Sequence, residues 1–379
     1  MTRIDRYILT LFLRTSLICF ASLSGIFIVF HAFTSMDDLV QMGQRAGSLP
    51  IAMAQFYGPY VLLLFDSTGA VIIVMSLLFT AAWLTRTGEL TATLSAGVSH
   101  GRIFRPMVIA AIAVVALQTI NREFVLPKYS RYLTLKADVE DDAKEQPVLA
   151  QYDKLNRILI DGRSVELSIA TLHDPHFRID GDYRGFGDAL RGQTAVWQRP
   201  DPAVGWGYRV SGVSEPKSID QIASVRFGDR TVLFTAADTS WLSAGECFVA
   251  TDVRVDYLAT AESSQKLASV VQLLDRVRNP AIHSSDAVKT RLHGRLVRPP
   301  LDVALFCLVL PLAAAGRGKN LFVMMAAALG TVLVFFVIKS TANVLGSGGY
   351  VITPIIAGWL PLMIVGPIGY MRWRAVAMQ

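Results

Sequence analysis

Titratable side chains inside apolar sequence are the first candidates for chemistry, because charge is costly in a membrane and is often kept there for function. Asp66 lies near the middle of the second long apolar run, and His31 lies near the end of the first. Asp302 lies near the start of the fourth run, and Lys339 ends the fifth. The side chain of Asp66 is too short to reach water easily. It should therefore line a cavity, make a buried polar contact or, as a third option, relay protons.

Motifs for hydrolysis or metal chemistry are missing from the sequence. The loop Gly316–Asn320 resembles a phosphate-binding loop, but that motif requires a glycine where Ala313 stands and a hydroxyl group at its last position. His173 and His176 fit a surface pair better than a metal motif, and the three cysteines form no disulfide or metal pattern. We therefore predict that the chain is not an enzyme and holds no metal or cofactor of its own.

The connection 86–99, between the second and third runs, predicts a short amphipathic helix. Its apolar face carries residues at the spacing i, i+3, i+4 and i+7, namely Leu90, Thr93, Leu94 and Gly97. The glycine that ends this series is a common helix stop. Glu89 is the only charged residue between Arg86 and Arg102, whereas a helix that binds lipid headgroups would carry basic residues. We expect this helix to bind a protein partner.

Membrane spans must position these residues. The chain has 379 residues, of which 52% are apolar and 17% charged, whereas soluble proteins carry about 25% charged residues. A span needs roughly 20 apolar residues, and six candidate runs lie at residues 15–33, 51–84, 103–120, 300–315, 321–338 and 351–371. The second run is too short to form two spans, so we expect one long helix there.

Lysine and arginine residues near the span ends predict the orientation. One side would carry Arg3, Arg6, Arg14, Arg86, Arg102, Arg105, Arg317, Lys319, Arg372 and Arg374. The short loops on the opposite side carry only Arg45. We therefore expect both termini in the cytoplasm and the long polar segment between the third and fourth runs outside.

That polar segment predicts an all-β domain. Charges balance between Arg122 and Arg298, so the net charge of +6 belongs to the apolar parts of the chain, which excludes a basic nucleic-acid-binding domain. Short β-like runs between turn residues favour a jelly-roll-like fold. They lie at residues 157–161, 164–169, 176–180, 207–210, 224–227 and 231–234, and helical spacing follows at 263–278.

Short motifs occur in a characteristic order along nearly the whole chain. They are Ile4–Ile8 at the start, Glu89-Leu90 before Ser95-Ala96-Gly97, Leu126-Pro127, His293–Leu301 and Leu310–Leu312. Together with six spans divided three and three around a β-domain, they resemble the LptF/LptG (YjgP/YjgQ) permease family of the lipopolysaccharide export ABC transporter. The opening motif and residues 354–361 resemble LptG more closely than LptF.

The resemblance implies an α-helical membrane protein of the bacterial inner membrane with a periplasmic jelly-roll-like domain. Residues 1–125 would hold spans one to three, residues 126–296 the periplasmic domain and residues 297–379 spans four to six. Such a permease extracts lipopolysaccharide or a related glycolipid and passes it to a periplasmic bridge.

The family's coupling helix follows the second span and sits in a groove of the ATPase LptB. Its acidic residue matches Glu89, and the positions named above would share this role. ATP and magnesium would be bound by an LptB-like ATPase dimer. The other implied partners are a second LptF/LptG-type permease chain and an LptC/LptA-like bridge.

The family's lipid cavity is lined by spans one, two, five and six, which makes His31, Asp66 and Lys339 candidates for its polar lining. Asp37 and Asp38 stand where LptG-type chains carry lysines that meet lipid phosphates, and Asp66 interrupts a stretch that is largely apolar in the family. Acidic residues repel phosphates, which leaves open a related permease with a different lipid specificity.

Two other functions fit parts of the sequence. A proton-coupled secondary transporter would use Asp66 and Lys339, although the two three-span halves show no inverted repeat. A non-transporting scaffold or sensor would use the β-domain to bind a signal outside the cell.

Overall fold

The chain folds into two compact units in the computed structural model. The structure describes residues 3–378, apart from 37–38, 41–43, 45–46, 130–132, 134–145, 168, 181–182, 184, 259–266, 283, 315–320 and 349–350. The helical unit comprises residues 1–134, 267–273 and 285–379. The β unit comprises residues 135–266 and 274–284.

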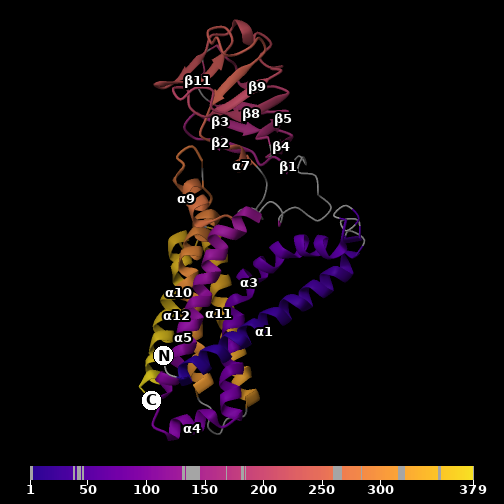
Figure 1. The fold of residues 1–379 in the computed structure, drawn as a ribbon. Helices are drawn as coiled ribbons and strands as arrows, with labels where there is room; N and C mark the ends of the chain where they lie inside the picture. The colour runs from indigo at the N-terminus through magenta and orange to yellow at the C-terminus, as the bar shows by residue number, and fades with distance from the viewer. Residues whose placement is uncertain are drawn as a thin grey trace. The chain divides into compact units, whose positions relative to one another are not determined.

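Long helices make up the helical unit. They are α1 (Arg3–Thr34), α3 (Leu49–Arg86), α5 (His100–Ile120), α10 (Asp286–Ala314), α11 (Leu321–Ser347) and α12 (Pro354–Ala377). Shorter elements are α4 (Glu89–Ser95), η1 (Asn121–Val125) and η2 (Leu126–Tyr129), and α9 (Val270–Arg278) spans the boundary between the units. Both chain ends and α4 lie at the same end of this unit (Figure 1).

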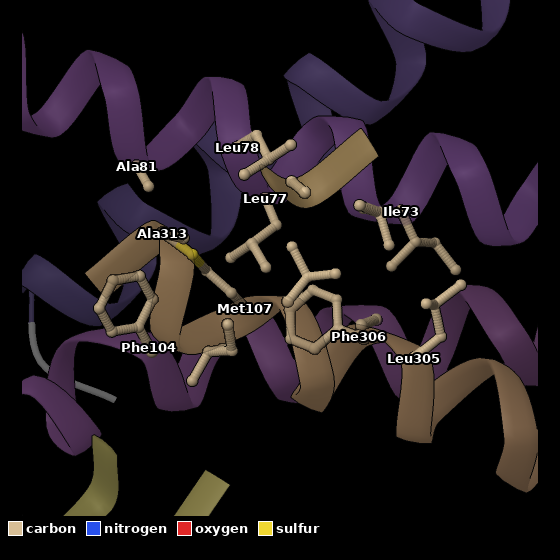
Figure 2. Packing of buried hydrophobic residues seen from close by; sticks show 14 of the residues in the cluster. Ile73, Leu77, Leu78, Ala81, Phe104, Met107, Leu305, Phe306 and Ala313 are labelled. Atoms are coloured by element: carbon tan, nitrogen blue, oxygen red, sulfur yellow. The ribbon is translucent and has the colours of Figure 1, made fainter. Parts of the chain in front are cut away.

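Apolar side chains from four helices pack at the centre of the helical unit. Phe12 of α1, Leu77 of α3, Met107 of α5 and Phe306 of α10 are buried in one cluster. The rings of Phe12 and Phe306 meet edge to face, with centroids 6.2 Å apart. Figure 2 shows side chains of α3, α5 and α10 pointing toward one another in this core. This core therefore fixes the relative positions of α3, α5 and α10, which carry or adjoin buried charged residues.

Six helices are long and apolar enough to cross a membrane in the part of the chain that the structure describes. Their burial within the chain differs. Half of the most apolar stretch of α3 and of α10 is buried, against 6% for α1. Because a span buried against its own chain cannot also face lipid, α1 has most of its surface left for lipid or another protein.

Twelve short strands form two antiparallel sheets in the described part of the β unit. The larger sheet has the order β1-β4-β5-β8-β9-β12-β11-β10, and the smaller has the order β2-β3-β6-β7. Their bounds are β1 Gln146–Pro147, β2 Gln151–Asp153, β3 Ile158–Asp161, β4 Ser164–Glu166, β5 Thr171–His173, β6 His176–Ile179, β7 Ala189–Arg191, β8 Thr194–Gln198, β9 Gly207–Ser211, β10 Val225–Phe227, β11 Arg230–Thr235 and β12 Cys247–Ala250. A 3-10 turn, η3 (Ile219–Gln221), and a short helix, α7 (Val255–Leu258), complete the unit.

Side chains from both sheets share one core. Ile160 and Phe177 come from the smaller sheet, Tyr208 and Val249 come from the larger, and all four are buried in the same cluster. The rings of Phe177 and Tyr208 lie 5.8 Å apart. Burial also raises the pKa of the Cys247 thiol, which keeps this free cysteine protonated and unreactive.

The predicted fold class is confirmed, with six candidate spans and an inserted antiparallel β region. The long second run is a single helix, α3. The fourth helix begins at Asp286 rather than near residue 300. Of the helix predicted over 263–278, the structure gives Val270–Arg278, and residues 263–266 lie outside the described part.

The predicted strand runs correspond to β3, β4, β6, β9, β10 and β11, with β4 ending at Glu166. None of the predicted runs corresponds to β1, β2, β5, β7, β8 or β12. Four of these have two or three residues, which is too short for alternation of apolar and polar side chains to be recognised.

Candidate functional site

Asp66 is buried in the helical unit and both of its carboxylate oxygens accept hydrogen bonds. The Arg122 Nε and Nη2 atoms each lie 2.7 Å from Oδ1. The Arg298 Nη1 atom lies 3.2 Å from Oδ2, and its Nη2 donates to the backbone oxygen of Asp66. The Asp66 side chain is 11% exposed and that of Arg122 is 4% exposed. Of the alternatives open from the sequence, the buried polar contact is the one present here.

Close packing of α3 and α5 brings the partners of Asp66 into place. A Cβ atom built on Gly69 would lie 1.6 Å from the Gln118 Nε2 atom, so the Gln118 amide occupies the space that the absent side chain leaves. Beyond α5, the Asn121 amide donates to the Leu62 carbonyl over 2.9 Å. Asn121 and Arg122 belong to η1, which continues the line of α5. The segment Ser67–Gly69 thus allows the close helix approach that its small residues predict.

A second acid extends this group along α10. Asp302 lies one helical turn after Arg298, and its Oδ2 is 3.8 Å from the Arg298 Nε. Asp302 also interacts electrostatically with Lys339 of α11. The Lys339 Nζ atom lies 5.8 Å from the centroid of the Phe336 ring. We call Asp66, Arg122, Arg298 and Asp302 the ionic cluster.

A neighbouring pair adds another link between the same elements. Glu123 follows Arg122 in η1, and its Oε1 lies 3.7 Å from the Arg295 Nη1 of α10. The Glu123 Oε2 accepts a hydrogen bond of 2.6 Å from the Val270 amide at the start of α9. Buried charges are tolerated when they are paired and hydrogen-bonded. The ionic cluster and this pair therefore tie α3, η1 and α10 together.

His31 belongs to an aromatic group near the end of α1. Its Nδ1 lies 3.2 Å from the Tyr57 hydroxyl. The rings of Phe27, Phe56 and Tyr60 surround it, with centroids 5.6 to 5.8 Å away. These contacts join α1 to the first part of α3. The structure thus brings Asp66 and Lys339 into one region through Asp302, and places His31 in a separate group.

The helix predicted at 86–99 is α4, flanked by two glycines with positive φ. Gly88 has φ 78° before the helix and Gly97 has φ 81° after it. Leu90 is buried, and Leu94 packs against the same core. These two leucines therefore hold α4 against its own chain. The exposed side of the helix consists of Thr91, Ala92 and Ser95.

Glu89 is the first residue of α4 and is half-buried. Its backbone carbonyl accepts a hydrogen bond of 2.7 Å from the Thr93 hydroxyl. A carboxylate near a helix N-terminus interacts favourably with the helix dipole. Glu89 therefore presents negative charge at the end of the unit where α4 and both chain termini lie (Figure 1).

Comparison with known families gives one match. The model of the family described as lipopolysaccharide export system permease LptF/LptG matches residues 6–157 and 238–375. The chain belongs to the LptF/LptG family. A search of curated proteins gave no significant match. The chain is therefore a multi-pass membrane permease of the lipopolysaccharide export type, a non-catalytic subunit of an ABC transporter whose ATPase is a separate subunit.

The two arginines of this permease's ionic cluster were not among the predicted site residues. The predicted bounds place Arg122 and Arg298 among the spans, and both lie in the helical unit, but the sequence assigned neither a contact. One signal was available, because Arg298 precedes Asp302 by four residues, the spacing of neighbours on a helix. The position of Arg122 depends on how α5 meets α3, which no local pattern reports.

Some residues used in the sequence-based predictions lie outside the described part of the chain. They include Asp37, Asp38, Arg45 and the loop 316–320. Among the described residues, no group of three or more His, Cys, Asp and Glu side chains is placed to hold a metal ion.

Proposed function

We propose that this permease is the LptG-like subunit of an exporter in the bacterial inner membrane. It would pair with a second LptF/LptG-type permease and an LptB-like ATPase dimer, and pass its cargo to an LptC/LptA-like bridge. The observation that carries the proposal is the family match, which covers both sets of three spans, including α4 between the second and third spans. The order of motifs, in particular the opening residues and residues 354–361, supports the LptG-like role.

The charge distribution supports an orientation with both termini and α4 in the cytoplasm. The basic residues gather at the span ends on that side. The β unit would then lie in the periplasm. ATP-driven closure of the partner subunits would displace α4, narrow the lipid cavity and expel the lipid outward.

The cargo would be lipopolysaccharide or a related large amphiphile. His31 and Lys339 are half-buried and remain our candidates for polar groups in the cavity wall. Asp66 would support that wall rather than bind cargo, because both of its carboxylate oxygens are engaged by arginines. Asp37 and Asp38, which replace lysines of LptG-type chains, favour a cargo with fewer phosphates.

Replacing Glu89 tests the coupling role of α4. Glu89→Ala removes the only acid in the α4 segment and should weaken ATPase binding, measured by copurification, at least tenfold, because a hydrogen bond to a charged group contributes about 1.5–3 kcal/mol. Permease abundance in the membrane should stay unchanged. Ser347→Ala, an exposed change at the end of α11, is the matched control.

Normal ATPase copurification and normal transport by Glu89→Ala would refute the coupling role. Transport that persists without any ATPase and stops in Asp66→Asn would instead indicate a proton-coupled secondary transporter. If no ATPase copurifies with the permease in mild detergent, the chain would instead be a scaffold or sensor.

A further inference from the structure

The first turns of α1 meet the first residue of α4. The Tyr7 hydroxyl donates a hydrogen bond to the Glu89 Oε1 over 3.2 Å. The two residues are 82 positions apart in the sequence. Tyr7 belongs to the opening motif Ile4–Ile8.

Apolar contacts beside this hydrogen bond hold the same two helix ends. Ile8 follows Tyr7, Leu90 follows Glu89, and both are buried in the helical core together with Ile103 of α5. A pocket of about 260 Å³ lies among them, lined by residues of α1, α3, α4 and α5. Because these contacts do not depend on the Tyr7 hydroxyl, its removal should leave the helix ends in place.

The hydrogen bond leaves part of the Glu89 carboxylate available. Tyr7 donates to one oxygen, and among the described contacts the other oxygen accepts no hydrogen bond. Tyrosine is a neutral donor, so it fixes the direction of the carboxylate without cancelling its charge. The second oxygen can therefore receive a basic side chain of a partner.

We propose that Tyr7 is a positioning residue that orients Glu89 toward the ATPase and ties the start of span one to the coupling helix. The inference rests on the coupling role of Glu89 proposed above. In sequence α4 is joined to α3 and α5, and the Tyr7 hydrogen bond adds a polar link to α1 beside the apolar contact of Ile8 with the same core. Of the six candidate spans, α1 is the least buried within the chain. When α4 moves, the hydrogen bond at the start of α1 would therefore move a helix that is little buried against the rest of its chain.

A double-mutant cycle tests this role, because it isolates the interaction between two side chains. Full-length permease complexes carrying wild type, Tyr7→Phe, Glu89→Ala or both changes are titrated with the purified ATPase. Tyr7→Phe should weaken ATPase binding about threefold, as expected for an exposed hydrogen bond. In the Glu89→Ala background, which lacks the acceptor, the same change should have no effect. Tyr370→Phe, an exposed tyrosine of α12, is the control.

The outcomes separate this inference from the proposed function. If Glu89→Ala does not weaken ATPase binding, the coupling role fails and the inference fails with it. If Glu89→Ala weakens binding but Tyr7→Phe binds like wild type, only the role of Tyr7 is overturned. An equal effect of Tyr7→Phe in both backgrounds would also overturn it, since Tyr7 would then act independently of Glu89.

Discussion

At the scale of single residues, the contacts of Asp66 determine what this carboxylate can do. A lone acid within a membrane span suggests proton transfer, but here two guanidinium groups occupy its oxygens. Burying an ion pair costs free energy, and breaking a buried ion pair costs more, because removal of one partner leaves the other charge buried without compensation. The role supported by the geometry is therefore to hold α3, η1 and α10 together.

Asp66→Asn should destabilise the permease by about 3 kcal/mol, since Arg122 and Arg298 would lose the negative charge between them. Thermal unfolding of the purified permease in detergent measures this effect. Asp286→Asn is the matched control, because its ion pair with Lys289 is 39–43% exposed and should contribute little. Equal melting temperatures for Asp66→Asn and wild type would contradict the structural role.

At the scale of helices, two glycines of α12 determine how closely α12 can approach α10. A Cβ atom on Gly358 of α12 would lie 2.4 Å from the His293 Cβ and 3.0 Å from its carbonyl carbon. A Cβ atom on Gly369 would lie 2.8 Å from the Ala304 carbonyl oxygen. These atoms belong to or adjoin the backbone of α10 and cannot rotate away. The close contact between α10 and α12 thus requires glycine at both positions, because even the methyl side chain of alanine would clash with α10.

Gly358→Ala should destabilise the helical unit by about 1–3 kcal/mol, the usual cost of overpacking. Gly330→Ala on α11 is the control, because no atom lies within 4 Å of a Cβ added there. Alanine favours helix more than glycine does, so the control should be neutral or slightly stabilising. Melting temperatures in detergent compare the two, and an unaffected Gly358→Ala would mean that α12 can move away from α10 at little cost.

The helix boundaries also show where local patterns are insufficient. The apolar run near residue 300 predicted a short fourth span, but α10 begins at Asp286. Its first half carries Lys289 and three arginines, Arg291, Arg295 and Arg298, so its hydropathy resembles that of the polar segment. Arg295 and Arg298 are instead paired with Glu123 and Asp66 inside the unit. A basic helical segment can therefore be buried where acids on neighbouring helices compensate its charge.

At the scale of the whole molecule, the two units differ in where their apolar side chains lie. The helical unit exposes large apolar side chains along α1, α11 and α12, such as Phe30, Val337 and Met363. A surface of this kind is stable in lipid or against another apolar protein surface. The β unit buries its apolar side chains between two sheets, as a domain in water must. The chain therefore combines one unit suited to the membrane with one suited to the aqueous compartment.

Cysteine labelling tests the proposed orientation. In a background without Cys19, Cys247 and Cys307, Ser95→Cys in α4 and Ala244→Cys in the β unit place one exposed thiol each. A membrane-impermeant maleimide that can enter the periplasm should label Ala244→Cys in intact cells. It should label Ser95→Cys only in inverted membrane vesicles. The reverse pattern would place α4 outside the cell.

The sequence alone was sufficient for features that depend on local patterns. Length and hydropathy predicted six spans, turn residues predicted the β insertion, and helical spacing located α4 between Arg86 and Gly97. The order of short motifs pointed to the family that the chain proved to match. Each of these signals extends over neighbouring residues, so it can be recognised without knowing how the elements pack.

The tertiary structure decided which distant residues meet. Arg122 and Arg298 are 56 and 232 positions from Asp66, and Tyr7 is 82 positions from Glu89. No periodicity connects such residues, because their contacts depend on how tightly α3 approaches α5 and how α4 folds back on α1. The chemistry of Asp66 and of Glu89 was therefore fixed by helix packing, through side chains that local sequence could not assign to them.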